Sequence, residues 1–467
     1  MATSPTENVI EQCKISPPAG SVPPSFHPLT ILDILWLTLP IVERLLFYEF
    51  HHSKAYFLET ILPKLKHSLS VTLQHFFPLA GNLAWPQDSS IPGIQYVDGD
   101  FVLLTVAESD YVDFTSLVGN HAKAVSSLYP LAPKLLDRST DKLCSLMALQ
   151  VTLFPKQGIC IGITFSHVVS DGRAINHFIK SWASICKQHG MDAGQSLLPT
   201  HDRSMLSKES IDSVSVNFLK KHNITRDTFY LPKNKSDLDL VVLPTDEKVL
   251  ATFVMRPSAI NRLRQWVLSR AENKKLHLST FVLTCAYAWV CLMKAQCGEE
   301  AAEEDTKEEF DYLIIPVDSR SRLDPPLPSA FFGNCITEII LKTKASDLTG
   351  NDGILIAAEL IGNAIQKMEK GDALLRDVER LRSSDIDFSS NRILSVAGSP
   401  KFGIYETDFG WGNPKKSEVI SIAGTGAIYL TESPTEVGGV EVGLARKVSE
   451  IYAITSLFAK TIEDIPC

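Results

Sequence analysis

The chain has 467 residues, of which 45% are hydrophobic, so it is long enough for two domains with packed cores. Its formal net charge of −9 argues against a nucleic-acid partner, because nucleic acids are bound by basic surfaces. Its nine cysteines include no Cys-x-x-Cys pair, which argues against a disulfide scaffold and a structural zinc site.

The N-terminal region predicts a cytoplasmic protein without a membrane partner. Residues 1–8 lack the basic segment followed by an apolar segment that marks a secretory signal. The most apolar early stretch, Leu29 to Val42, is interrupted by Asp33 and Pro40 and is too short to span a bilayer. The odd number of cysteines fits the same reducing compartment.

The first half of the chain is predicted to combine long helices with buried strands. Apolar residues at helical spacing predict one helix over Lys54 to Phe77 and another over Arg173 to Lys187. Two apolar runs, Leu143 to Phe154 and Ile159 to Phe165, are joined by a turn and predict neighbouring strands. Before these elements, Phe26 to Trp36 is expected to be an extended arm.

A change in composition separates the two halves. Residues 199–245 are rich in Ser, Asp, Lys and Asn and show weak periodicity, which predicts a long crossover between domains at 1–198 and 246–467. The run from Glu299 to Glu309 holds seven acids and one lysine, and we expect it to be a solvated loop.

The second half is predicted to use the same kinds of element. Strands are expected at Val249–Val254, Tyr312–Val317 and Cys335–Leu341, and helices at Pro257–Ala271, Phe281–Ala295 and Ile354–Met368. Short antiparallel strands are expected in the tail, at Val419–Ile422, Gly426–Thr431 and Val440–Ala445.

His167 is the leading candidate for a catalytic residue, because it follows a predicted buried strand and precedes a turn. An imidazole exchanges protons near neutral pH, which suits a general base. Asp171 either contacts His167 or turns away to pair with a distant arginine that braces the loop. A metal site at His167 and Asp171 is a weaker alternative, because no third ligand stands at a recognisable spacing.

Rival chemistries lack their sequence motifs. No Gly-x-Ser-x-Gly nucleophile elbow and no Gly-x-x-x-x-Gly-Lys phosphate loop occur, and Gly424-Thr-Gly426 lacks the third glycine of a dinucleotide-binding loop. These absences argue against a hydrolase, a kinase and a dehydrogenase.

A second motif, Asp408-Phe-Gly-Trp-Gly412, lies far along the chain from His167. Together with His167-Val-Val-Ser-Asp171-Gly172 it resembles the plant BAHD acyltransferases, which transfer acyl groups from coenzyme A thioesters to alcohols or amines. The resemblance covers nearly the whole chain. Phe332-Gly-Asn-Cys335 is similar to a signature of the branch that acylates anthocyanins and other phenolic glycosides, with Phe331 where that signature has tyrosine.

The resemblance implies an α/β fold of two similar domains of the chloramphenicol-acetyltransferase type, each a mixed sheet with helices. It implies a monomer that uses an acyl-coenzyme A co-substrate and holds neither a permanent cofactor nor a metal. His167 would deprotonate the acceptor hydroxyl for direct attack on the thioester.

The branch that the chain resembles favours malonyl transfer from malonyl-coenzyme A to a sugar hydroxyl of a phenolic or flavonoid glucoside. Hydroxycinnamoyl transfer to an anthocyanin, or to another alcohol or amine, is the alternative. A catalytically silent binding protein is disfavoured, because His167 and Asp171 are both present.

The resemblance also implies structural roles. It pairs Asp171 with Arg320 or Arg322, and the sequence does not choose between the two. The second motif is expected to support the fold away from the reacting centre, since its glycines permit tight turns beside a bulky indole. The residues concerned are Asp408, Gly410, Trp411 and Gly412.

Four further residues are candidate contacts of the acyl donor. Ser279 and Thr280 stand at a predicted helix start and suit a phosphate, although a plain N-cap uses the same groups. Arg173 could hold a malonyl carboxylate, or it could be an exposed cation without function. Ser399 stands where some family members carry a tryptophan thought to serve the oxyanion, so it is a nominee for that donor.

Overall fold

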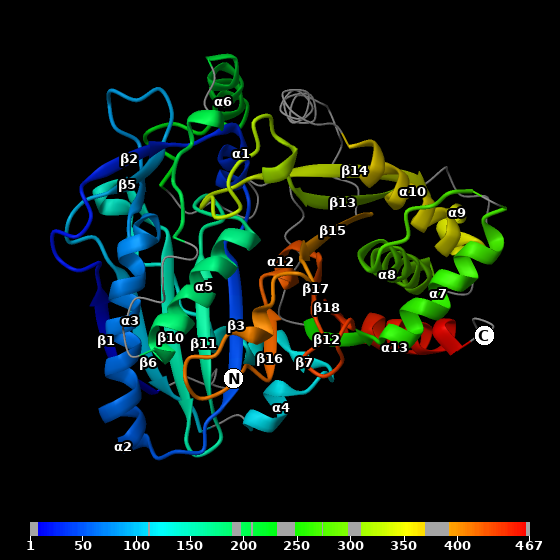
Figure 1. Ribbon diagram of the computed structural model, residues 1–467, viewed down its shortest axis with the longest axis horizontal. Helices are drawn as coiled ribbons and strands as arrows, with labels where there is room; N and C mark the ends of the chain where they lie inside the picture. The colour runs from blue at the N-terminus through cyan, green and yellow to red at the C-terminus, as the bar shows by residue number, and fades with distance from the viewer. Residues whose placement is uncertain are drawn as a thin grey trace.

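The computed structural model describes eight stretches of the chain: 8–110, 113–188, 198–206, 209–230, 248–272, 274–297, 310–368 and 392–463. The acidic run at 299–309 and residues 231–245 of the predicted crossover lie outside these stretches. The described residues form two lobes, one built mainly from the first half of the sequence and the other mainly from the second (Figure 1).

The first lobe is organised around a six-stranded mixed sheet. Its strands lie in the order β1 (Asn8–Ile15), β6 (Val102–Glu108), β10 (Met147–Phe154), β11 (Gly158–Phe165), β3 (Val42–Glu49) and β16 (Lys416–Val419). The pairing of β10 with β6 is parallel, and the other four are antiparallel. Helices α3 (Leu62–His75) and α5 (Gly172–Lys187) pack against each other across its face (Figure 1).

Strands β10 and β11 form the centre of this sheet, as their sequences predict. Every residue of both strands is buried, which explains why their apolar runs do not alternate with polar residues. They pair antiparallel from Met147 opposite Phe165 to Phe154 opposite Gly158. The end of β11 at Phe165 therefore delivers the chain to His167 from a rigid support.

The predicted helix over Lys54 to Phe77 is present in three consecutive parts. It consists of α2 (Lys54–Tyr56), a π-helical turn (Phe57–Ile61) and α3, and Pro63 stands in the first turn of α3. Proline is tolerated at that position because the first N–H groups of a helix need no intrahelical partner.

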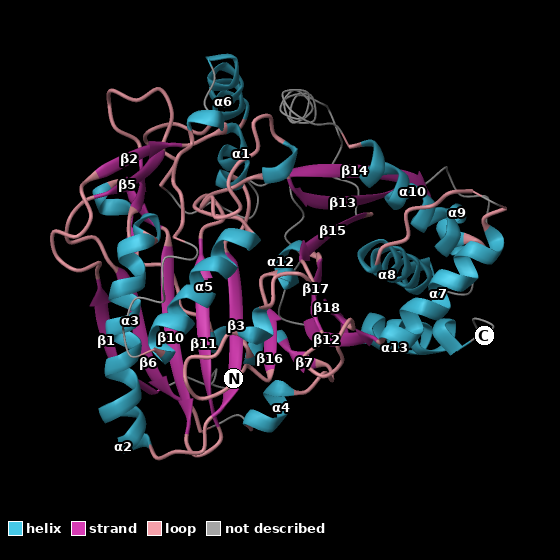
Figure 2. Cartoon of the chain, viewed as in Figure 1, coloured by secondary structure: helices cyan, strands magenta, loops and turns pink. Residues whose placement is uncertain are grey.

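The second lobe is organised around a seven-stranded sheet. Its strands lie in the order β14 (Ile336–Lys344), β13 (Phe310–Asp318), β15 (Ile393–Gly398), β17 (Ile428–Glu432), β18 (Val440–Lys447), β12 (Lys248–Met255) and β7 (Lys123–Ala124). Four helices gather beside it: α7 (Pro257–Arg270), α8 (Thr280–Cys297), α10 (Gly353–Lys367) and α13 (Val448–Glu463) (Figure 2). Their apolar residues and those of the sheet form one buried cluster.

The two lobes exchange strands across the predicted boundary between 1–198 and 246–467. Strand β16 comes from the second half of the sequence and pairs with β3, whereas β7 comes from the first half and pairs with β12. Figure 1 shows the orange β16 beside the blue β3. Local periodicity predicts that a strand exists but does not identify its partner, so this exchange was not predicted.

Two other predictions of strands are wrong in part. The strand expected over Leu143 to Phe154 is broken at Leu146, and its first piece, β9 (Leu143–Ser145), joins a separate five-stranded sheet with β2 (Ser25–Pro28), β5 (Gly93–Tyr96), β4 (Asn82–Ala84) and β8 (Asp137–Arg138). The strand expected over Val419–Ile422 ends at Val419, and Ile422 begins the short helix α12 (Ile422–Thr425).

Two helices occur where the sequence was expected to be extended or irregular. The arm from Phe26 to Trp36 contains α1 (Ile31–Ile34), which Thr30 and Asp33 cap reciprocally. The predicted crossover contains α6 (Glu209–Lys221). No helix in the described part of the chain is both long and apolar enough to cross a membrane.

Candidate active site

His167 lies in the short connection between β11 and α5, at the contact between the two lobes. Its Nδ1 is 3.1 Å from Oδ1 of Asn334, which stands two residues before β14 of the second lobe. One face of the imidazole is covered by Trp36, with ring centroids 3.5 Å apart and ring planes 10° from parallel. The ring is therefore fixed in position and in plane by two side chains distant in sequence.

The surroundings of His167 favour its neutral form. Burial lowers the pKa of His167, and hydrogen bonds to its own backbone and to Asn334, with the charges of Asp171 and Asp33, offset only part of that shift. A neutral imidazole has a free lone pair, so His167 can accept a proton at neutral pH.

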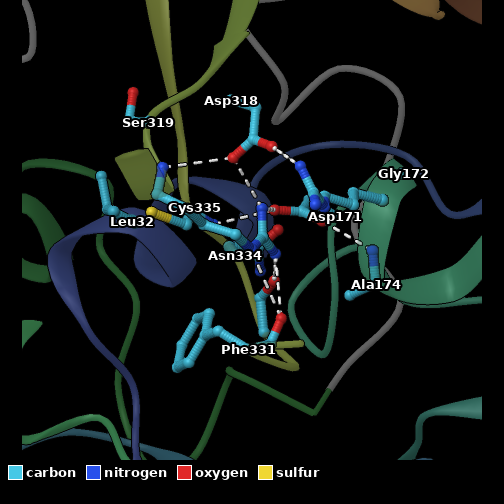
Figure 3. A network of polar contacts seen from close by, with 12 residues as sticks. Leu32, Asp171, Gly172, Ala174, Asp318, Ser319, Phe331, Asn334 and Cys335 are labelled. Carbon is cyan, nitrogen blue, oxygen red and sulfur yellow. Dashed lines mark hydrogen bonds and ion pairs between the residues drawn. The ribbon is translucent and has the colours of Figure 1, made fainter. Parts of the chain in front are cut away.

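Asp171 braces the loop and forms no hydrogen bond with the His167 side chain. It is 1% exposed and caps α5, because its Oδ1 accepts from the N–H of Ala174 at 2.9 Å. Its Oδ2 accepts from the N–H of Cys335 at 2.9 Å and lies 2.9 Å from Nη1 of Arg320 (Figure 3). The two alternatives left open by the sequence are thus separated: Asp171 turns away from His167 and pairs with an arginine.

Arg320 is the arginine that meets Asp171, and Arg322 forms no ion pair with any described residue. The buried guanidinium of Arg320 also donates to the backbone carbonyls of Phe331 and Gly333, at 3.2 and 3.1 Å. Backbone groups of Phe331, Gly333 and Cys335 therefore contact the ion pair, and Figure 3 shows Phe331 and Cys335 in the same network as Asp171.

Asp318 links this buried pair to Arg173. Its two carboxylate oxygens lie 2.9 Å from Nη1 of Arg320 and 2.7 Å from Nη1 of Arg173. Burial alone would raise the pKa of Asp318, but Arg320 and Arg173 together hold it below its ordinary value. Arg173 stands in the first turn of α5 and is half exposed, so its cation is accessible but already bound.

The other nominated donor contacts lie elsewhere. Ser279 caps α8, because its Oγ accepts from the N–H of Val282 at 3.3 Å, and Thr280 begins that helix. Ser399 follows β15 and accepts from the N–H of Lys401 at 3.3 Å. No contact among the described residues joins Ser279, Thr280 or Ser399 to His167.

The second motif forms a tight loop at the far end of α5. Asp408 accepts from the N–H groups of Gly410 and Gly412 at 2.8 and 2.9 Å, and its other oxygen pairs with Lys187 at 2.7 Å. Although burial raises the pKa of Asp408, Lys187 and the two N–H groups lower it overall. Trp411 packs on the rings of Phe409, Tyr48 and Phe50.

The position of this loop separates it from the base. Helix α5 has 16 residues between its start beside Asp171 and its end at Lys187. At about 1.5 Å per residue, roughly 24 Å separate the two ends. The loop therefore contacts α5 far from the base, at Trp182 and Lys187.

Sequence reasoning missed three residues of the site: Trp36, Asp33 and Arg203. Trp36 covers His167. The buried Asp33 accepts a hydrogen bond from Nδ2 of Asn334 at 2.9 Å and pairs with Arg203. The signal for Asp33 was present: an acid inside an apolar stretch was interpreted only as an interruption, although a buried charge requires partners.

Two mixed-sheet lobes, with a histidine at the end of a central buried strand where the lobes meet, have the fold of the acyltransferases of the chloramphenicol-acetyltransferase type. Residues 9–460 match the model of the Transferase family, and the chain belongs to this family, the BAHD acyltransferases. The predicted α/β fold, the family and the class of enzyme are confirmed.

Known proteins resemble the chain over nearly its full length. It is 37% identical to coumaroyl-CoA:anthocyanidin 3-O-glucoside-6''-O-coumaroyltransferase 1 of Arabidopsis thaliana, over 97% of both chains. It is 38% identical to phenolic glucoside malonyltransferase 1 of Nicotiana tabacum, over 89% of this chain and 90% of that protein. The crystal structure of vinorine synthase superposes with a TM-score of 0.68 at 22% identity, over 97% of this chain and 98% of that one.

Proposed function

We propose that the enzyme transfers a malonyl group from malonyl-coenzyme A to a sugar hydroxyl of a phenolic or flavonoid glucoside, with His167 as the general base. The observation that carries the catalytic part is the imidazole held at Nδ1 by Asn334, because this leaves Nε2 as the nitrogen that can face a substrate. Relatives named as glucoside malonyl- and coumaroyltransferases support the acceptor class.

The reaction follows from one proton transfer in each direction. Nε2 of His167 takes the proton of the acceptor hydroxyl as the oxygen forms a bond to the thioester carbonyl carbon. The carbon–sulfur bond then breaks, and the proton passes from His167 to the sulfur of coenzyme A. The imidazole is neutral again at the end, because it has given up the proton, and this state agrees with the lowered pKa of His167.

Other groups complete the proposed site. Ser279 and Thr280 remain the proposed phosphate contacts, and Ser399 the proposed oxyanion donor. The loop of Ser399 supports that role, since Phe402 donates its N–H to the carbonyl of Ser399 and packs against Gly172, beside Asp171. We place the monomeric enzyme in the cytoplasm, which agrees with seven described cysteines that form no disulfide.

Arg173 is the proposed partner of the malonyl carboxylate. It follows Asp171 by two residues and its guanidinium is half exposed. Asp318 already pairs with Arg173, so an incoming carboxylate must share the guanidinium or displace Asp318. This occupancy favours the second candidate, transfer of a hydroxycinnamoyl group, which has no carboxylate to bind.

The two donors are distinguished by kcat/KM for malonyl-coenzyme A and for p-coumaroyl-coenzyme A, with a flavonoid glucoside as acceptor. We expect Arg173→Ala to lower the malonyl value roughly 10- to 100-fold and to spare the p-coumaroyl value. Lys180→Ala is the matched control, because Lys180 is another cation on α5 that pairs with a carboxylate, Glu406, at 3.0 Å. Equal losses on both donors, or a wild-type preference for p-coumaroyl-coenzyme A, would overturn the malonyl proposal.

A further inference from the structure

The motif Phe332-Gly-Asn-Cys335 contains the side chain that contacts His167, and its other partners bear on the tautomer of the base. Asn334 is fully buried, and its Oδ1 lies 3.1 Å from Nδ1 of His167. The acidic residue of the first motif, Asp171, makes no such contact, since both its oxygens are held by Arg320 and backbone N–H groups.

The orientation of the Asn334 amide follows from its other partners. Its Nδ2 lies 2.9 Å from Oδ1 of Asp33, 2.9 Å from the carbonyl of His167 and 3.2 Å from the carbonyl of Val168. All three partners are acceptors. A flipped amide would place its own oxygen against these three oxygens, none of which can donate a hydrogen bond, so the oxygen must face His167.

An amide oxygen only accepts hydrogen bonds, so the ring nitrogen that faces it must carry hydrogen. We propose that Asn334 is a positioning residue that holds neutral His167 in the Nδ1–H tautomer, leaving the lone pair of Nε2 free for the acceptor hydroxyl. The proposal rests on His167 being the general base, and it gives Asn334 the orienting task that a carboxylate performs in other catalytic histidine pairs.

The amide is itself held by a buried ion pair. Asp33 on α1 is fully buried and pairs with Arg203, from the segment that follows the first lobe. Arg203 therefore fixes Asp33, Asp33 fixes the NH2 of Asn334, and the oxygen of Asn334 fixes His167. Trp36, two residues after α1, sets the plane of the ring by stacking.

The tautomer can be measured in the wild-type enzyme without substrate. Protein labelled with 15N in histidine is studied by solid-state NMR above the pKa of His167, and the His167 signals are assigned by their loss in His167→Gln. We expect a protonated Nδ1 and an unprotonated Nε2. A protonated Nε2 with a bare Nδ1 would overturn the proposal, even if every Asn334 variant failed to fold.

The variant Asn334→Leu keeps the approximate size of the side chain and removes its oxygen. We expect kcat to fall roughly 10- to 100-fold with KM values little changed, because only the work of the base is impaired. The low-pH limb of kcat/KM should also move to lower pH, since the lost acceptor favoured the imidazolium. Two charged groups, Asp171 and Asp33, raise the pKa of His167, and both remain in this variant.

Asn176→Leu is the matched control. Asn176 is another buried asparagine, on α5, and its amide contacts Arg44 and the carbonyl of Gly172. It should lose stability without moving the pH limb or the NMR signals. If Asn334→Leu also left both readouts unchanged, Asn334 would be only a structural residue. A failure of the base assignment itself is seen separately, as undiminished turnover in His167→Ala.

Discussion

Two residues that the sequence sets four apart perform different tasks. The ring of His167 lies at the junction of the lobes. The carboxylate of Asp171 instead forms an ion pair, caps a helix and accepts from a backbone N–H of the other lobe. A buried carboxylate needs several partners to offset its desolvation, and Asp171 obtains them from three elements. The spacing between the two residues thus reflects how the loop is anchored, and the orientation of the base comes from elsewhere.

Replacement of the base should remove most of the activity. We expect His167→Ala to lower kcat roughly 10²- to 10⁴-fold while the protein stays folded, because a placed base contributes about that much. The surface variant His121→Ala is the control, since His121 is exposed and its ring hydrogen-bonds to the nearby Ser116. Turnover with an acyl-coenzyme A and circular dichroism measure the two effects. Retention of more than about a tenth of the rate would identify another base.

The pH dependence of the wild type follows from the same residue. Because burial lowers the pKa of His167 below its ordinary value of 6.5, the neutral base persists to lower pH than a free histidine would allow. The value of kcat/KM should therefore rise with pH through a midpoint below 6.5 and then level off. A midpoint above that value would contradict the buried, partly desolvated position of the ring.

The choice between the two arginines can be tested by stability. Arg320→Met leaves Asp171 buried without its cation, and breaking such a pair costs about 3 to 5 kcal/mol. Arg322→Met removes the same charge from a side chain without an ion pair among the described residues, and surface changes of this kind stay within about 0.5 kcal/mol. Urea unfolding of both variants measures the difference, and equal losses would refute the assigned pairing.

At the scale of elements, the sequence pattern predicted the helices and strands whose formation depends on their own residues. Strand β11 and helix α5 were predicted nearly to the residue, because continuous apolar residues and helical periodicity are properties of the segment itself. The break at Leu146 and the pairing of β16 with β3 depend on residues far away in the sequence, and neither was predicted. The same division holds in the site. The sequence pattern identified His167, but only folding brings Trp36 against His167 and Asp33 against Asn334.

The loop of the second motif depends on backbone conformation. Gly412 has φ of +108°, and a Cβ added there would meet nothing within 4 Å, so any cost of a side chain is conformational. We expect Gly412→Ala to destabilise the protein by about 1 kcal/mol or more. Gly424→Ala is the control, because that site is equally open but lies in helix α12, where alanine should stabilise slightly. Similar unfolding midpoints for both variants would contradict this account.

At the scale of the whole molecule, the exchanged strands are joined by buried charges. Lys123 on β7 pairs with Glu418 on β16 at 2.8 Å, and Lys416 on β16 pairs with Glu441 on β18 at 3.0 Å. The hydroxyl of Tyr405 also donates to Glu441, at 2.8 Å. All four ionised groups are buried, so each needs its partner, and the pairs form only when both strands sit in the opposite lobe. These two buried ion pairs therefore specify one relative placement of the lobes.

This interlock predicts that neither half is an independent folding unit. A fragment ending before residue 231 lacks β16, which leaves the edge of β3 open along Leu45, Leu46 and Phe47. An open, apolar edge strand promotes aggregation, so we expect this fragment to be insoluble when expressed alone. Co-expression with residues 248–467 should rescue it and yield a complex that co-purifies through a tag on one fragment. A second fragment with residues 416–419 replaced by glycine and serine is the matched control and should not rescue. A soluble first fragment with cooperative thermal unfolding would show that β16 is dispensable to that sheet.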